Sequence, residues 1–151
     1  MKLRRAQPDL CIMHYELCIM NYAFPKSERL CSKKHIEQLF AGDSHSFAAY
    51  PLRAVYRERP LASQPTSLAP AVVLISVSKR RFKHAVDRNR TKRLIREAYR
   101  LNKHLLLPQL AGHNIDLAFI WISDQLSDFP TVEAKVRNLL QRIGENEKVI
   151  K

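Results

Sequence analysis

The chain has 151 residues, a length that suits one folded domain and is too short for two packed cores. Its hydrophobic content of 46% supports a globular core and excludes a chain that is disordered throughout. With 26 Lys and Arg against 14 Asp and Glu, the formal net charge is +12. A domain this basic attracts polyanions, although a solvated charged face without a partner is an alternative until the distribution of the charge is known.

The first part of the chain is informative mainly for what it excludes. Cysteines occur at positions 11, 18 and 31, and this odd number with these gaps argues against both a disulfide framework and a zinc site. We therefore expect reduced thiols in a cytoplasmic protein. No apolar run approaches the roughly 18 residues that a membrane span needs, and Asp9, His14 and Glu16 interrupt the apolar stretch that a signal peptide would require. Residues 9–22 nearly repeat one seven-residue stretch, and we interpret 1–23 as an extension that is disordered or that precedes a true start at Met20.

The folded domain is expected to span residues 24–144 and to be followed by a tail at 145–151. Its first element is a helix that begins after Ser32, a suitable N-cap, and ends at Gly42, a natural C-terminal stop. Spacings of three and four place three apolar residues of this helix on one face. These are Ile36, Leu39 and Phe40.

Three segments have the pattern of strands. Residues 47–56 alternate, with Leu52, Ala54 and Tyr56 on one side and Arg53 and Val55 on the other. Residues 71–77 are an almost continuous apolar run, as expected of a central strand buried on both faces. Residues 115–122, which include the sole tryptophan, indicate another buried strand. The intervening residues 59–70 contain three prolines and are predicted to form a loop.

Two helices complete the pattern. A long basic helix follows the apolar run and ends before Pro108 and Gly112. Pro130 fits the first turn of the last helix, whose apolar stripe Gly144 is expected to end. That stripe consists of Val136, Leu139, Leu140 and Ile143. The order helix, strands, helix, strand, helix predicts an α+β fold, namely a single-domain two-layer α/β sandwich with one layer of helices.

The net charge is concentrated in residues 79–104. This segment has eleven Lys or Arg against two acids, and the difference, +9, is most of the chain's +12. If Asp87 caps the helix, basic residues recur at every fourth position along one face, at Arg88, Lys92, Arg96 and Arg100. Like charges at this spacing destabilise a helix by about 0.2–0.5 kcal/mol per pair, so a phosphate ladder explains them better than a solvated face does. The opposite, apolar stripe consists of Leu94, Ile95, Ala98, Leu101 and Leu105.

Residues 76–100 closely resemble the RNR signature of the bacterial ribonuclease P protein; they read SVSKRRFKHAVDRNRTKRLIREAYR. Residues 24–40 are similar to that family's first helix; they read FPKSERLCSKKHIEQLF. The resemblance covers about residues 24–143. It implies one α/β domain, of a type shared with a ribosomal protein, in which a βαβ crossover is left-handed against the usual right-handed rule.

The resemblance also implies roles for particular residues. In the family the RNR helix contacts the catalytic RNA, which assigns to that surface Arg88, Asn89, Arg90, Lys92, Arg93 and Arg96. A cleft between the first helix and the sheet holds the single-stranded 5′ leader of precursor tRNA, and by position it would be lined by Ile36, Phe40 and Tyr56. Ile36 stands where the family often has phenylalanine. Auxiliary basic contacts are expected at Lys79, Arg80, Arg81, Lys83 and Arg100.

The function that this resemblance implies is that of the protein subunit of ribonuclease P, with one protein per catalytic RNA. The RNA and its bound Mg²⁺ would perform the hydrolysis, and the protein itself would bind no cofactor or metal. The sequence agrees, because its six histidines are dispersed and none lies in a recognisable nucleophile motif. Two alternatives stay open: a ribosomal-type RNA-binding protein without a processing role, and a small basic ribonuclease that acts alone.

Overall fold

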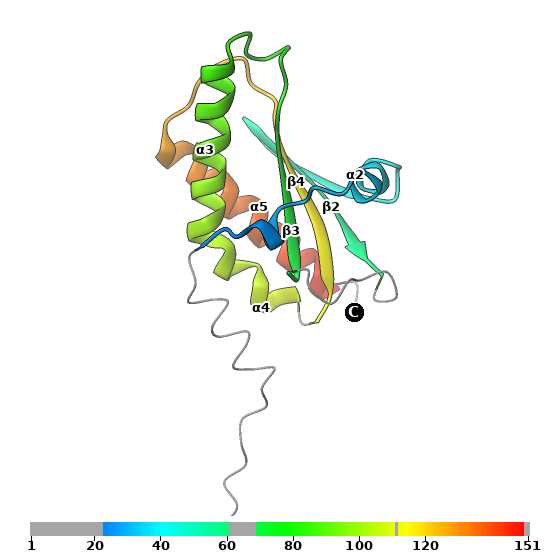
Figure 1. Ribbon diagram of the computed structural model, residues 1–151. Coiled ribbons are helices and arrows are strands. Elements are labelled where there is room, and N and C mark those ends of the chain that lie inside the picture. Colours follow the sequence, from blue (N-terminus) through cyan, green and yellow to red (C-terminus); the bar gives the residue numbers. More distant parts are fainter. Residues whose placement is uncertain (1–22, 61–68, 111, 150–151) are drawn as a thin grey trace, which may run out of the picture.

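The structure, a computed structural model, describes residues 23–60, 69–110 and 112–149 (Figure 1). Its helices are η1 (Lys26–Glu28), α2 (Lys33–Leu39), α3 (Ala85–Asn102), η3 (Lys103–Leu105), α4 (Leu107–Leu110) and α5 (Phe129–Val149). Its strands are β1 (His45–Ala49), β2 (Leu52–Arg59), β3 (Ala71–Val77) and β4 (Asn114–Trp121). The near-repeat at 9–22 and the suggested start at Met20 lie outside the described residues, as does most of the predicted loop.

The four strands form one mixed sheet in the order β1-β2-β4-β3. β2 is antiparallel to both of its neighbours, whereas β3 and β4 are parallel. α3 joins these two adjacent parallel strands, and this is the crossover for which the family resemblance implies a left-handed sense. The predicted α+β class is confirmed. The single strand expected over 47–56 is instead a hairpin, because the chain turns at Tyr50 and Pro51 between β1 and β2.

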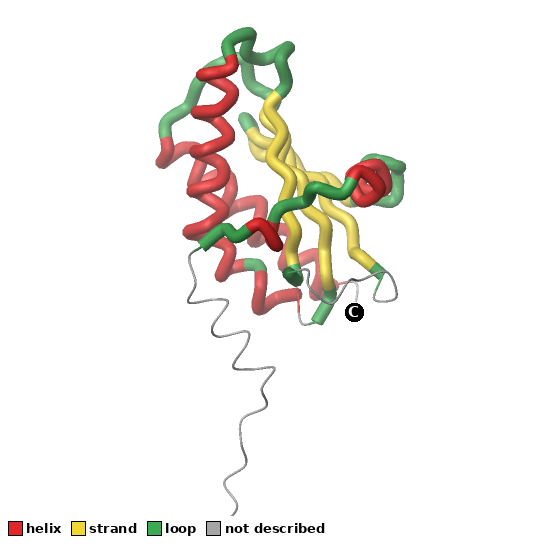
Figure 2. Tube along the Cα trace, in the orientation of Figure 1, coloured by secondary structure: helices red, strands yellow, loops and turns green. Residues whose placement is uncertain are grey.

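Helices lie on both faces of the sheet, but unequally (Figure 2). α3 and α5 pack together against one face and enclose the larger core, to which β2 contributes Leu52, Ala54 and Tyr56. α2 lies on the other face over a smaller core, whose buried residues are Leu30, Leu39, Val55, Val72 and Ala118. The alternation predicted for β2 is therefore confirmed. We call the sheet face that α2 covers the α2 face.

The last helix is longer than the sequence predicts. All four residues of the predicted α5 stripe are fully buried, but the helix continues past Gly144 to Val149 and takes in part of the expected tail. Gly144 is not a stop, because it is buried where the side chain of Gln109 would collide with any Cβ. The absence of a side chain here permits close packing of α5 against α4.

β3 is an edge strand and not the central strand that its apolar run predicts; β2 and β4 occupy the centre. It is apolar because both of its faces are covered, with Val73 in the larger core and Val72 in the smaller one. Its outer edge is partly covered as well, since the N–H of Leu30 donates to the carbonyl of Val73 at 3.0 Å and Arg29 forms a parallel bridge to the same residue. A covered edge is protected from pairing with another chain.

A buried ion pair fixes the N-terminal segment to the end of α3. The Nζ of Lys103, a residue only 2% exposed, donates to the Oε1 of Glu28 at 2.9 Å and to the carbonyl of Ala23 at 2.6 Å. The ring of Phe24 packs edge-on against that of Tyr99, with 5.7 Å between the ring centroids. Burial raises the pKa of Tyr99 far above its usual range, and the negative charge of Glu28 acts in the same direction, so Tyr99 stays protonated.

Candidate nucleic-acid interface

α3 begins earlier than the sequence predicts. Its N-cap is His84 and its first residue is Ala85, so Asp87 lies in the first turn and is not the cap. A carboxylate in the first turn still interacts favourably with the helix dipole. Because the start shifts, the residues between the end of β3 and the helix form a short turn, residues 78–84, which we call the basic turn.

The buried side of α3 differs in part from the predicted apolar stripe. Ile95 and Ala98 are fully buried, whereas Leu94, Leu101 and Leu105 are only half-buried at its margin. The buried side also includes Thr91, Tyr99 and Asn102. An apolar sequence pattern cannot predict that the polar residues Thr91 and Asn102 are buried. They are accommodated because Thr91 Oγ1 donates to the carbonyl of Asp87 at 2.9 Å and Asn102 Nδ2 to that of Ala98 at 2.8 Å.

The row of basic residues at every fourth position lies along the margin of the buried side of α3 and not at the centre of its exposed side. A spacing of four overshoots a helical turn by about 40°, so the row drifts by about 120° over its four members. All four of its members, Arg88, Lys92, Arg96 and Arg100, are half-buried. Arg88, at the start, points back to the protein and donates from NH1 to the carbonyls of Phe82 at 2.8 Å and Lys83 at 2.7 Å.

The exposed residues of the RNR segment are Asn89, Arg90 and Arg93. Their spacings of three and four place them on one side of the N-terminal half of α3. In the basic turn Lys79, Arg80, Arg81 and Lys83 are exposed as well. Across the described residues no acid forms an ion pair with Arg90 or Arg93. The structure thus brings together a common basic surface, though one centred on other positions than the predicted row.

Arg100 differs from these residues because it is paired. Its Nε donates to the Oε2 of Glu97 at 2.9 Å on the adjoining turn of the helix. This hydrogen bond, together with the positive charge of Arg100, lowers the pKa of Glu97 below its usual value, and it raises the pKa of Arg100. The charge of Arg100 is therefore already matched within the protein.

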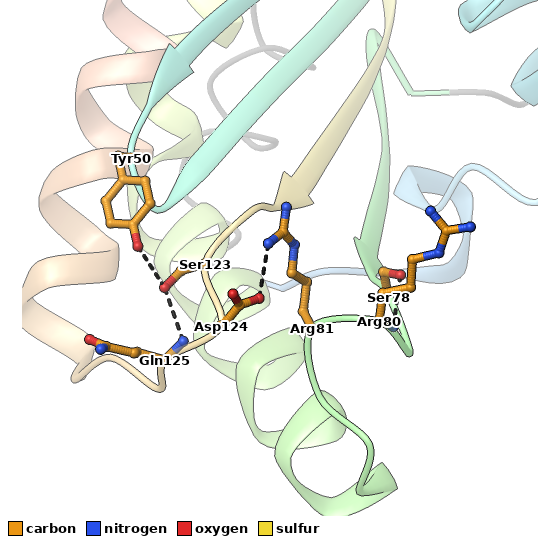
Figure 3. A network of polar contacts seen from close by, with 7 residues as sticks. All are labelled: Tyr50, Ser78, Arg80, Arg81, Ser123, Asp124 and Gln125. Atoms are coloured by element: carbon orange, nitrogen blue, oxygen red, sulfur yellow. Dashed lines mark hydrogen bonds and ion pairs between the residues drawn. The ribbon is translucent and has the colours of Figure 1, made fainter.

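Three loops meet at the end of the sheet from which the basic turn leaves (Figure 3). Arg81 NH1 donates to the Oδ1 of Asp124 at 2.9 Å, which ties the basic turn to the segment after β4. The hydroxyl of Tyr50, in the β1–β2 turn, donates to Ser123 Oγ at 2.9 Å. The same Ser123 oxygen accepts the N–H of Gln125 at 3.0 Å. The β1–β2 turn is thereby connected to the basic turn through residues 123–124.

The α2 face offers a second, mixed surface. Phe40 is 50% exposed at the end of α2, and Ile36 is half-buried and packs with Leu74 and Ile120 on the smaller core. Arg53, which is exposed, and Arg57, which is half-buried, alternate with the core residues of β2 and so point to this face. The sequence pattern placed Arg53 on this side without assigning it a role.

Tyr56 does not belong to the α2 face, so its prediction as a residue of the leader cleft is wrong. It is fully buried in the larger core, where its ring stacks on Phe47 at 6.0 Å between centroids and its hydroxyl accepts a hydrogen bond from Asn146 of α5. The side-chain alternation of β2 already implied this position, because Tyr56 lies an even number of residues from Leu52 and Ala54 and so shares their face of the sheet. Its neighbour Val55 lies on the α2 face.

A buried carboxylate fixes α2 on this face. Asp116, only 4% exposed, accepts a hydrogen bond on Oδ1 from Arg59 Nε at 3.1 Å, and its Oδ2 lies 3.4 Å from His35 Nδ1. Arg59 also donates to the carbonyl of Ile115 at 3.2 Å. These residues come from β4, β2 and α2, so no local sequence pattern could have grouped them.

The described residues contain neither a candidate metal site nor a membrane-spanning helix. No group of three or more His, Cys, Asp or Glu in residues 23–60, 69–110 and 112–149 could hold a metal ion. Within the same ranges, no helix combines the length and the apolar composition that a bilayer crossing requires.

A family model described as Ribonuclease P matches residues 24–144. The chain belongs to the ribonuclease P protein family. A ribonuclease P protein component from Porphyromonas gingivalis is 47% identical over 127 residues, which are 83% of this chain and 89% of the relative. One from Chlorobaculum tepidum is 33% identical over 132 residues, covering 82% of this chain and 84% of the relative.

Solved structures of the ribonuclease P family share the fold. The RNase P protein from Thermotoga maritima superimposes with a TM-score of 0.57 at 25% identity, covering 76% of this chain and 96% of that one. The RNase P protein of Staphylococcus aureus has a TM-score of 0.52 at 22% identity, covering 83% and 100%, and shows the fold alone. The family match extends over both candidate surfaces, the basic surface of α3 and the α2 face.

Proposed function

We propose that the chain is the protein subunit of ribonuclease P, which joins the catalytic RNA and helps it to remove the 5′ leader from precursor tRNA. The observation that carries this proposal is the group of exposed basic residues on the basic turn and the N-terminal half of α3, in a chain of this family. One protein is proposed to bind one RNA.

The basic surface is proposed to dock on the catalytic RNA. Arg90, Arg93 and Asn89 are exposed and point away from the core, where they can contact phosphate oxygens. Each phosphate that an arginine neutralises releases counterions, so affinity should fall steeply as salt rises. The half-buried Lys92 and Arg96 can add contacts at the margin of this surface. Arg88 acts differently, since its hydrogen bonds to two carbonyls hold the shape of the basic turn.

The α2 face is proposed to hold the leader of the precursor. Phe40 presents an aromatic ring on which a base can stack, and stacking tolerates any base sequence. Ile36 and Val55 supply an apolar floor, while Arg53 and Arg57 supply positive charge for the backbone. An RNA-binding protein that must accept many leaders gains from contacts of this kind, because they do not depend on the identity of the bases.

Hydrolysis and its Mg²⁺ are assigned to the RNA subunit. The protein's contribution is to neutralise phosphates and to hold the substrate, which is the task that its basic composition suits. The protein is thus a component of an endoribonuclease without supplying the reacting groups, and no metal or cofactor is assigned to the chain itself.

Reconstitution tests this proposal. Purified protein is incubated with precursor tRNA, with and without the cognate RNA, at moderate Mg²⁺. We expect cleavage only with the RNA, and faster cleavage when the protein is added. Cleavage by the protein alone would identify a small basic ribonuclease, and a cleaving RNA that the protein does not stimulate would favour a ribosomal-type binding protein.

A variant of the α2 face tests the substrate site. Phe40→Ala should weaken binding of precursor tRNA to the holoenzyme by about 1–3 kcal/mol, the cost of losing one stacked base, and leave the affinity for mature tRNA unchanged. Equal losses for both tRNAs would point to a damaged fold. Tyr56→Ala is the matched control on the opposite sheet face. It should lower the melting temperature of the protein, but it should not weaken binding of precursor tRNA more than binding of mature tRNA.

A further inference from the structure

The β1–β2 turn carries an aromatic ring that the fold does not use. Tyr50 is 64% exposed, more than any other Phe, Tyr or Trp that the structure describes. The exposed position gives up most of the stability that burial of a ring of this size would contribute. Random exposure would leave the ring mobile, but here its hydroxyl donates to Ser123 Oγ at 2.9 Å.

The serine that accepts the hydrogen bond of Tyr50 is itself held in place. Ser123 is only 3% exposed, and its oxygen also accepts the N–H of Gln125 at 3.0 Å. A tyrosine has two side-chain torsions, and the bond to a buried serine restricts both. The ring can therefore meet a flat partner at a small cost in conformational entropy.

The surroundings of the ring favour a polyanion. Figure 3 shows the Tyr50 ring on one side of the segment Ser123–Asp124 and the guanidinium of Arg81 on the other. Two acids lie in the loop after β4; Arg81 neutralises Asp124, and Asp128 is the second. Against them the basic turn presents Lys79, Arg80 and Lys83, all exposed. The four cations of the basic turn outnumber the two acids of the loop after β4, so this end of the sheet has a positive balance.

We propose that Tyr50 is a stacking platform for an unpaired RNA base, whose neighbouring phosphates contact the basic turn. This inference rests on the proposed function and adds a third RNA contact, at the end of the sheet. Stacking on a tyrosine requires no particular base, and the cations of the basic turn, which leaves the same end of the sheet, can contact phosphates further along the same strand. A flat apolar surface of a protein partner would gain no binding energy from the excess of positive charge at this end of the sheet. The base can come from the catalytic RNA or from the tRNA substrate.

Two substitutions isolate the ring. Tyr50→Phe and Tyr50→Leu both remove the hydroxyl bond to Ser123, but only the first keeps an aromatic face. We expect the Leu variant to bind RNA about 5- to 100-fold more weakly than the Phe variant, the range for loss of one stacked base. Melting temperatures of the two should agree, because the ring is exposed in the native protein.

Three affinities identify the source of the base. They are those of the protein for the cognate catalytic RNA, of the holoenzyme for precursor tRNA, and of the holoenzyme for mature tRNA. If the Phe and Leu variants differ in affinity for the catalytic RNA, the base belongs to the catalytic RNA. If they differ only in the affinity of the holoenzyme for precursor tRNA, the base lies in the leader. If they differ equally for precursor and mature tRNA, the base lies in the tRNA body.

The outcome that overturns the platform is a Leu variant that matches the Phe variant in all three affinities while the wild-type protein stimulates cleavage. That result leaves the proposed function intact. If instead the wild-type protein fails to stimulate the RNA at all, the proposed function itself is wrong, and the two failures are thereby distinguished.

Discussion

The two ends of α3 carry the same kinds of side chain in opposite surroundings. At the N-terminal end Arg90 and Arg93 are exposed, and the basic turn adds Lys79, Arg80 and Lys83, besides Arg81, which is paired with Asp124. At the C-terminal end Arg100 is paired with Glu97, and Lys103 is buried against Glu28. A charge count along the sequence treats these residues alike. The structure shows that only the N-terminal group is available to a partner, which places the docking surface at one end of the helix.

The helix dipole makes this difference more informative. Cations near a helix C-terminus are favourable, so Arg100 and Lys103 would be stabilising without any ligand. Cations near a helix N-terminus are unfavourable for the same reason, and yet the basic residues accumulate there. An N-terminal end with exposed N–H groups and arginines is well suited to phosphate. The cations of the basic turn, which lie next to the N-terminus of α3, are therefore unfavourable in the isolated protein and are among those proposed to contact RNA.

The largest effect is expected from breaking the buried pair at the C-terminal end. Lys103→Met leaves the carboxylate of Glu28 buried without its partner, which should destabilise the protein by about 3–5 kcal/mol in urea unfolding. The double variant Glu28→Gln/Lys103→Met should recover most of this loss, because neither charge then remains. A single variant as stable as the wild type would show that the pair does not fix the N-terminal segment.

A smaller loss of stability is expected at the boundary between the two ends. Arg88→Ala removes two hydrogen bonds from a charged donor to the carbonyls of Phe82 and Lys83, and it should cost about 1–3 kcal/mol. RNA affinity should fall with it, because the basic turn loses its support. If urea unfolding of the variant equals that of the wild type while RNA binding drops, Arg88 contacts RNA directly and its assignment to the turn is incorrect.

The exposed arginines should affect binding and not folding. Arg93→Ala should leave stability within about 0.5 kcal/mol of the wild type. In binding to the catalytic RNA, the slope of log affinity against log salt should become shallower by about one phosphate contact, or 0.7–0.9. Arg90→Ala is the parallel case on the same side of α3. Unchanged slopes in both variants would mean that the RNA docks elsewhere.

The smallest effect is expected for Arg100→Ala, the matched control for Arg93. The salt slope should not change, because the charge of Arg100 is already paired. The pKa of Glu97, now lowered, should rise toward its ordinary value of 4.5, as measured by NMR titration of its carboxyl. A carboxyl group whose pKa is lower in the folded protein than in the unfolded chain stabilises the fold at pH values above the unfolded pKa. This stability is lost as the pH falls through the folded pKa. In the variant the pKa of Glu97 is no longer lowered, so this pH-dependent contribution to stability should disappear. If Arg100→Ala reduced the salt slope as much as Arg93→Ala does, the proposed difference between the two ends of α3 would be wrong.

Much of the site was readable from the sequence. The helix at 85–102 and the residues of β2 that face α2 follow from local spacing, because helices and strands repeat with fixed periods. The RNR segment was recognised by its resemblance to the family. The spacing of four did not show that all four members of the row are half-buried at the margin of the buried side. The family resemblance grouped Tyr56 with Ile36 and Phe40, although the alternation of β2 placed Tyr56 on the other side of the sheet.

By itself the sequence determined the order of elements, the α+β class and the position of the basic segment, since each depends on residues that are neighbours in the chain. The tertiary structure decided which charges remain available: Glu28 and Lys103 are 75 residues apart, and Arg59 and Asp116 are 57 apart. It also decided that β3 is an edge strand with a covered edge. Pairing and burial depend on which distant segments meet, and no local period encodes that.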